Sequence, residues 1–211
     1  MSRRLERITR LLESPVDLAP RALMLAAALL LGAVYLLPLW NLTMYAPQYP
    51  DGLRLDIYSY KLQGGNRGQD VEEINVLNHY IGMQDLVAED FTEFKWMPFV
   101  VGALGLVVLR AAVQGQVGQV LDVFVLFGYF GAFSLWSFGY KMWSYGHSLA
   151  PTAAVKVEPF MPPMLGHARL ANFDVYAYPG PATYAMLAAG AALCAALVLA
   201  WRDGHRRLAA A

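Results

Sequence analysis

A short row of metal-binding side chains stands out in the sequence EEINVLNHYIGM, residues 72–83. Asn75, His79 and Met83 recur every four residues, a spacing that places side chains on one face of a helix. Imidazole and thioether are soft to borderline ligands, and without cysteine or a carboxylate pair they favour copper, above all Cu(I), over zinc, calcium or magnesium. The row predicts a copper site with His79 and Met83 as ligands and Asn75 as a further candidate.

A second group of candidates lies in the segment 141–183. His147 follows the aromatic stretch YKMWSYG and is the third predicted ligand of the copper site. Three second-rank candidates follow at three-residue spacing: Met161, Met164 and His167. Two prolines between them exclude an ordinary helix, so we expect a loop there. The alternative interpretation is structural, with histidines bonded to backbone carbonyls and methionines packed against aromatic rings.

Other chemistries find less support in the sequence. Haem is the weaker metal hypothesis, because there is no Cys-x-x-Cys-His motif and the predicted spans contain no histidine. The single cysteine, Cys194, excludes an intrachain disulfide. Nucleophile elbows, His-Glu-x-x-His motifs and phosphate-binding loops are absent, so we do not expect an enzyme.

The composition indicates a membrane protein. Of 211 residues 57% are hydrophobic and 15% charged, the net charge is zero, and the mean hydropathy is positive. A nucleic-acid partner is not expected, because phosphate binding needs a clustered basic face.

Four stretches approach the roughly 20 apolar residues that a transmembrane helix needs. They are residues 22–40, 96–113, 120–140 and 184–201. The predicted fold class is an all-α membrane protein of four transmembrane helices, with a mixed, loop-rich periplasmic cap formed by residues 41–95 and 141–183.

The distribution of arginine predicts the orientation. Nine arginines fall in the short segments on one side of the spans: Arg3, Arg4, Arg7, Arg10, Arg21, Arg110, Arg202, Arg206 and Arg207. Positive charges stay on the cytoplasmic side. We therefore expect a bacterial inner-membrane protein with both termini cytoplasmic, an amphipathic N-terminus (1–21) on the lipid surface and a tail at 202–211. The alternative of a cleaved signal peptide is disfavoured, because no small-x-small cleavage site follows the first span.

The segment 41–95 contains sequence patterns typical of one strand and one helix. LRLDIYSY (53–60) alternates as a strand does. Asp70 is expected to cap a helix, with Glu73 closing a capping box. An apolar stripe of Ile74, Leu77 and Ile81 then runs to a helix end near Gly82.

An acidic run follows this helix; it is most simply a solvated face, and it is the candidate docking site for a basic partner. It consists of Asp85, Glu89, Asp90 and Glu93.

Several motifs together resemble a known group. APQYPDGLRLDIY, EINVLNHYIGM and YGHSLAP, followed by VKVEPFMPPMLG and LANF, resemble small multispanning membrane proteins of bacterial nitrous oxide reductase gene clusters, the NosB-type proteins. The resemblance covers roughly residues 40–100 and 140–180. It includes Asn75, Asn78, His79, Met83, Gly146 and His147, and it does not extend to Met161, Met164 or His167.

The resemblance implies assistance to a periplasmic copper enzyme, with that enzyme or a copper chaperone as the partner. We therefore expect a copper-binding inner-membrane protein that helps to assemble or supply such an enzyme. Two alternatives stay open: a membrane electron-transfer component feeding the reductase, and a metal-free assembly or anchoring subunit.

Overall fold

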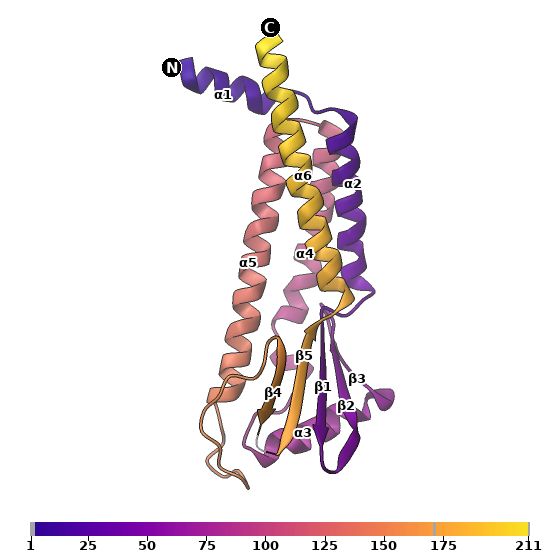
Figure 1. The fold of residues 1–211 in the computed structure, drawn as a ribbon, viewed down its shortest axis with the longest axis vertical. Helices are drawn as coiled ribbons and strands as arrows, with labels where there is room; N and C mark the ends of the chain where they lie inside the picture. Colours follow the sequence, from indigo (N-terminus) through magenta and orange to yellow (C-terminus); the bar gives the residue numbers. More distant parts are fainter. Residues whose placement is uncertain (1–2, 171, 211) are drawn as a thin grey trace. The chain divides into compact units, whose positions relative to one another are not determined.

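The computed structural model describes residues 3–170 and 172–210 (Figure 1). The helices in this part of the chain are α1 (Arg3–Glu13), α2 (Leu18–Gly32), α3 (Gln69–Tyr80), α4 (Glu93–Gln114), α5 (Val117–His147) and α6 (Pro181–Ala210). The strands are β1 (Trp40–Ala46), β2 (Tyr49–Ile57), β3 (Leu62–Gly64), β4 (Gly166–Leu170) and β5 (Phe173–Pro179). Short 3₁₀ turns lie at Ala33–Tyr35, Asn66–Gly68 and Ala88–Asp90.

The contacts divide the chain into two compact units. The helical unit consists of Met1–Val34, Phe99–Ala132 and Ala185–Ala211. The sheet unit consists of Tyr35–Pro98 and Phe133–Tyr184.

Four helices in the described residues are long and apolar enough to cross a membrane, in agreement with the four predicted spans. They are Leu18–Tyr35, Glu93–Gln114, Val117–His147 and Pro181–Ala209. The first begins and ends earlier than the predicted 22–40. The helical backbone ends at Tyr35, shortly before Pro38, and Trp40, the last residue of the predicted span, is the first residue of β1.

The fold is not all-α, and that prediction was wrong. The sheet unit contains a five-stranded antiparallel sheet in the order β3-β2-β1-β5-β4. The central strand β1 pairs with β2 through Met44 opposite Leu53, and with β5 through Met44 opposite Val175. The sheet thus joins the two large segments that were predicted to form a loop-rich cap.

Alternation of side chains explains why these stretches are strands. In β5, Phe173, Val175 and Ala177 are buried, whereas Asp174 and Tyr176 point to the other face. In β1, Met44 and Ala46 are buried on either side of the exposed Tyr45. One face of the sheet is therefore apolar and needs cover.

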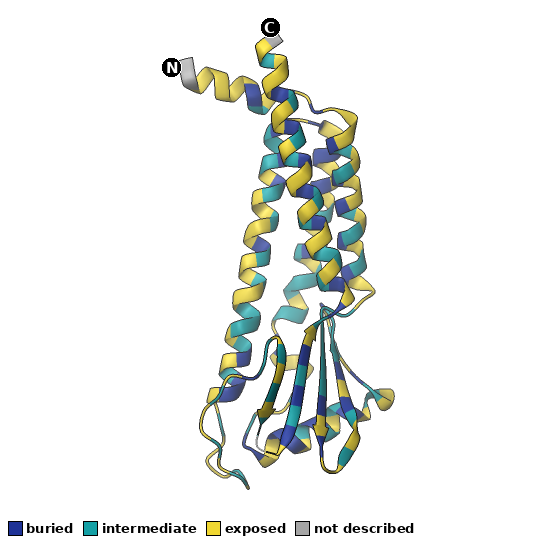
Figure 2. Ribbon diagram, in the orientation of Figure 1, coloured by how far each residue is buried: buried dark blue, intermediate teal, exposed yellow. Residues whose placement is uncertain are grey.

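Helix α3 covers that apolar face. Ile74, Leu77 and Ile81 are buried in one core with Leu53 and Leu55 of β2, as the apolar stripe predicted (Figure 2). Full burial of such a side chain contributes about 1.5–3 kcal/mol. This packing fixes the helix that carries the predicted ligands.

The start of α3 differs from the prediction. Gly68, with φ of 101°, is the N-cap, and Asp70 lies inside the first turn. Its buried carboxylate accepts hydrogen bonds from the Arg54 backbone N–H at 2.8 Å and from Asn66 Nδ2 at 2.7 Å. Glu73 accepts a hydrogen bond from the Tyr49 hydroxyl instead of closing a capping box. Both carboxylates therefore attach α3 to the sheet region.

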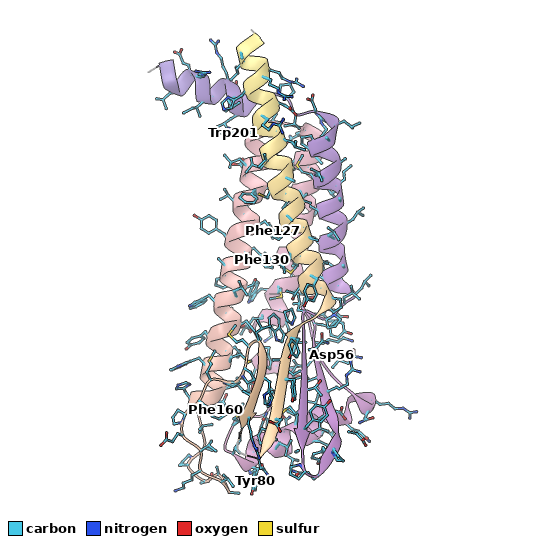
Figure 3. The ribbon with its side chains drawn as sticks, in the orientation of Figure 1. Asp56, Tyr80, Phe127, Phe130, Phe160 and Trp201 are labelled. Carbon is cyan, nitrogen blue, oxygen red and sulfur yellow. The ribbon has the colours of Figure 1, made fainter. Side chains whose placement is uncertain are left out.

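In the helical unit, small residues allow close helix contacts. A Cβ on Gly190 of α6 would lie 2.9 Å from the Phe127 ring of α5, a residue labelled in Figure 3. Ala189, Leu193 and Ala196 are fully buried along the same helix. This is the packing that alanine and glycine favour in membrane helices.

Candidate functional site

The predicted ligands His79 and His147 lie on two segments that one stretch of chain ties together. The Ala150 backbone N–H donates to the Gly82 carbonyl at 2.7 Å, just after α3. The Phe160 N–H donates to the Gly146 carbonyl at 3.1 Å, at the end of α5. Residues 150–160 therefore join the end of α3 to the end of α5, and we call this region the junction.

Two glycines, Gly82 and Gly146, allow the backbone of the junction to approach the ends of α3 and α5 closely. Gly82 has φ of +81°, and a Cβ there would lie 2.9 Å from the Ala150 carbonyl oxygen. A Cβ on Gly146 would lie 1.9 Å from the Phe160 oxygen, which no side chain tolerates. Both positions require glycine for close backbone approach.

The row Asn75, His79, Met83 has three different surroundings. Asn75 Oδ1 accepts a hydrogen bond from the Leu86 N–H at 2.7 Å and so positions the chain after α3. His79 is exposed on the last turn of α3. Met83 is half-buried and packs against the core of the sheet unit.

Asn78, a position that the resemblance includes, also shapes this helix end. It is buried, its backbone carbonyl accepts from the Met83 N–H at 2.8 Å, and its Nδ2 donates to the Gln84 oxygen at 3.5 Å. The two asparagines thus have structural roles.

His147 is exposed and held by Trp143. Its Nδ1 lies 2.9 Å from the Trp143 carbonyl oxygen, and its ring stacks on the indole with centroids 4.5 Å apart. When Nδ1–H donates to that carbonyl, the lone pair of Nε2 stays available. Metal-binding histidines commonly have this arrangement, in which the second nitrogen donates to a backbone carbonyl.

In the part of the chain that the structure describes, no three His, Cys, Asp or Glu side chains group as ligands of one ion. A copper site at the junction therefore depends on thioether or amide ligands beside the histidines. Met83 is the methionine nearest in sequence to His79.

The second-rank candidates have different surroundings. Met161 is exposed, and Met164 lies beside Gly139 of α5. His167 lies in strand β4, not in the predicted loop; its Nε2 is 2.7 Å from Asp174 Oδ1 and its ring stacks on Tyr176.

The acidic run is held through its backbone. The Tyr145 hydroxyl donates to the Asp85 carbonyl oxygen at 3.3 Å, and Lys141 Nζ donates to the Asp90 carbonyl oxygen at 2.9 Å. Buried Phe91 stacks on the Tyr145 ring. The side chains of Asp85, Glu89 and Asp90 stay exposed as a result.

Glu93 differs from the rest of the run. Its Oε1 accepts a hydrogen bond from the Ser137 hydroxyl at 2.6 Å, and the residue is half-buried. We define the acidic edge as Asp85, Glu89 and Asp90.

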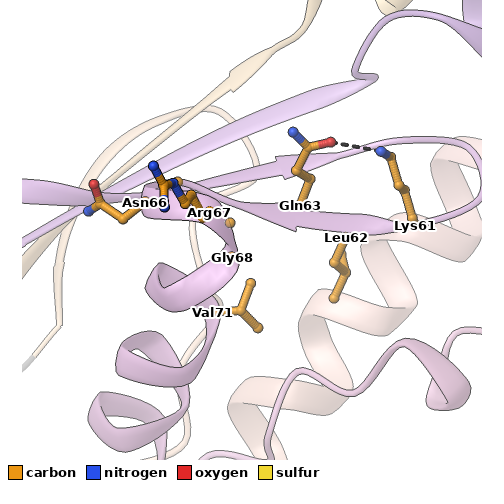
Figure 4. A pocket seen from close by; sticks show the side chains of 9 residues that line it. Lys61, Leu62, Gln63, Asn66, Arg67, Gly68 and Val71 are labelled. Carbon is orange, nitrogen blue, oxygen red and sulfur yellow. Dashed lines mark hydrogen bonds between the residues drawn. The ribbon is translucent and has the colours of Figure 1, made fainter.

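A groove with a volume of about 670 Å³ lies at the start of α3 (Figure 4). It is lined by residues 61–68 and Val71, with Lys61 donating to Gln63 Oε1 at 2.7 Å. Sequence reasoning did not select this groove, although its three glycines, Gly64, Gly65 and Gly68, mark irregular backbone. It contains none of the predicted ligands.

Comparisons of the chain with models of protein families, with curated proteins and with solved structures find no match.

Proposed function

We propose that this protein is a membrane-anchored accessory subunit that docks a basic partner on the acidic edge of its sheet unit. The observation that carries the proposal is the backbone anchoring of residues 85–90 by Lys141 and Tyr145. Side chains that are not needed to hold their own segment are free to bind another molecule.

The location of this edge follows from the orientation expected from arginine. Nine of the twelve arginines lie in the short segments on one side of the candidate spans. We therefore place residues 41–95, which contain the acidic edge, on the periplasmic side of a bacterial inner membrane. Complementary charge there raises the association rate and favours basic partners. The resemblance to proteins of nitrous oxide reductase gene clusters suggests a periplasmic copper enzyme or a copper chaperone as that partner.

Affinity copurification tests the proposal. The tagged chain is incubated in detergent with purified nitrous oxide reductase, and the triple variant Asp85→Lys, Glu89→Lys, Asp90→Lys is compared with wild type. The matched control reverses Asp51, Glu72 and Glu158, three exposed carboxylates outside the edge. We expect at least tenfold weaker capture by the edge variant alone. Equal capture by all three proteins contradicts the proposal.

Copper supply is the second candidate function, and the orientation of the His147 ring supports it. A ring fixed through Nδ1 presents Nε2 for a soft cation. His79 stands on the segment that residues 150–160 tie to the end of α5. We propose His79, Met83 and His147 as the Cu(I) ligands.

Titration with Cu(I) against a competing chelator tests this second function. His79→Ala, His147→Ala and Met83→Ala are compared with wild type, with His205→Ala as the control outside the sheet unit. Losses of tenfold or more in the first three alone support copper binding. Equal, weak binding in all five proteins removes the copper function and leaves the docking function standing.

A further inference from the structure

Helix α1 has one apolar face and one basic face. In RRLERITRLLE, Leu5, Ile8 and Leu12 share one side, whereas Arg7 and Arg10 lie on the other. Leu5 is 54% exposed and Ile8 is 50% exposed. In the described structure, therefore, this apolar face is uncovered along its first two turns.

The last turn of α1 is fixed to the helical unit. Leu11 is only 3% exposed. A Cβ on Gly204 of α6 would lie 2.7 Å from Leu11 Cδ1 and 2.7 Å from Ser14 Oγ, and a Cβ on Gly118 would lie 3.2 Å from the Leu12 oxygen. The helix is thus held at one end beside α5 and α6, and the orientation of its open face is set by these contacts.

The last turns of α6 add further positive charge beside α1 (Figure 1). Arg202 and Arg206 are exposed, as are Arg7 and Arg10. Among the described residues, these four arginines have no carboxylate within salt-bridge distance, whereas Arg207 pairs with Asp17. We call Arg7, Arg10, Arg202 and Arg206 the arginine surface.

We propose that the arginine surface binds the phosphate headgroups of anionic phospholipids, while Leu5 and Ile8 enter the acyl-chain boundary. Guanidinium groups match phosphate oxygens in a two-bond geometry. A short helix with leucines on one face and arginines on the other lies in the plane of the membrane interface.

An anionic membrane fits this surface better than an acidic soluble protein. The uncovered leucine and isoleucine of α1 need an apolar environment, and the unpaired arginines of α1 and α6 need negative charge beside it. A bilayer supplies both at its headgroup boundary, next to the candidate spans of the same unit. Basic sites at the ends of membrane helices commonly bind such headgroups.

Spin-labelled lipids measure the headgroup preference directly. The full chain is reconstituted in phosphatidylcholine vesicles, and the association of spin-labelled phosphatidylglycerol is compared with that of spin-labelled phosphatidylcholine. We expect a severalfold preference for phosphatidylglycerol in the wild type. Each arginine near the membrane surface raises the association constant for an anionic membrane about fivefold.

Matched double variants localise the effect. Arg7→Gln with Arg10→Gln, and separately Arg202→Gln with Arg206→Gln, should each lower the phosphatidylglycerol preference. Arg54→Gln with Arg169→Gln, two exposed arginines of the sheet unit, should leave it unchanged. Equal preference in all four proteins, or loss in the control alone, overturns the proposal.

The salt dependence of the wild-type phosphatidylglycerol preference tests the proposal even if a variant fails to fold. Wild-type preference should fall towards one between about 0.05 M and 1 M NaCl, because the Debye length shortens from more than 10 Å to about 3 Å. A preference that does not change with salt overturns the proposal.

The depth of a fluorophore in the bilayer tests whether the apolar face of α1 enters the membrane. A fluorophore on Thr9→Cys, in a chain with Cys194→Ala, should be quenched by lipids that carry the quencher just below the headgroups. Leu5→Ser with Ile8→Ser should reduce that quenching at least twofold. A fluorophore that is equally accessible to an aqueous quencher before and after reconstitution contradicts the insertion of α1.

Discussion

The carbonyl oxygen of Gly82 accepts a hydrogen bond from the backbone N–H of Ala150 at 2.7 Å, and this contact joins the end of α3 to the stretch that follows α5. Gly82→Ala should destabilise the sheet unit by about 1–3 kcal/mol, because alanine is strained at φ of +81°. Its Cβ would also lie 2.9 Å from both the Ala150 oxygen and the Ala153 Cβ. Chemical unfolding of the detergent-solubilised chain measures the change.

Gly166→Ala separates backbone strain from the steric contact at Gly82. Gly166 also has positive φ, +90°, but a Cβ there meets nothing within 4 Å. We expect a smaller loss of stability at Gly166. An equal loss at both positions would show that the Ala150 contact adds nothing.

Asp70 is predicted to be the most sensitive carboxylate of the sheet unit. It is 3% exposed, and its two oxygens accept from Arg54 N–H and Asn66 Nδ2. Asp70→Ala leaves a backbone donor unpaired, which costs about 1–3 kcal/mol. Asp51→Ala, at an exposed position of β2, should change the free energy of unfolding by less than about 0.5 kcal/mol. A similar small effect at Asp70 would contradict its anchoring role.

The apolar elements of this fold were predictable because they are long or periodic. The four spans follow from uncharged stretches, and the buried face of α3 follows from the spacing of Ile74, Leu77 and Ile81. The strand LRLDIYSY was also found in part, since β2 ends at Ile57. Burial in lipid or in a core leaves a clear pattern in the sequence.

The sheet was missed because its strands come from distant segments. FDVYAYP alternates in the way a strand does, but its partner β1 lies far away in the chain and begins with Trp40, at the end of an apolar run. The Asp70 capping box was wrong for a related reason. Its carboxylate bonds to Arg54, a contact that exists only after β2 packs near α3.

The sequence predicted which residues are candidate ligands, but not what each of them contacts. The four-residue spacing of Asn75, His79 and Met83 follows from the helix, but their partners follow from tertiary contacts. Asn75 bonds to Leu86 and Met83 packs in the core. Spacing alone does not distinguish such structural roles from ligation.

The pair Tyr49 and Glu73 gives the sheet unit a pH dependence at its alkaline limit. The hydrogen bond to Glu73, with burial and the charge of that carboxylate, raises the pKa of Tyr49 above its ordinary value of 10.0. The neutral phenol is therefore favoured in the folded state. The stability that this hydrogen bond adds is fully present below the pKa that Tyr49 has in the unfolded chain. It is lost as the pH rises through the higher pKa that Tyr49 has in the folded chain.

Unfolding measurements across that range test the pair. Between pH 9 and 11.5, the wild type should lose more stability than Tyr49→Phe, which has no ionisable phenol. Glu73→Gln should lower the pKa of Tyr49 towards 10, seen as earlier phenolate absorbance in the difference spectrum. Identical pH profiles of wild type and Tyr49→Phe would contradict this coupling.

The ring of His147 should carry its neutral-state proton on Nδ1. The Trp143 carbonyl oxygen, 2.9 Å from Nδ1, accepts a hydrogen bond and has no proton to donate. Exposed histidines such as His79 should favour the other tautomer, with the proton on Nε2. Nitrogen-15 spectra of histidine-labelled protein above pH 8 distinguish the two, with His147→Gln assigning the signal. A proton on Nε2 of His147 would leave that nitrogen without a lone pair for copper, and the second candidate function would lose the observation that supports it.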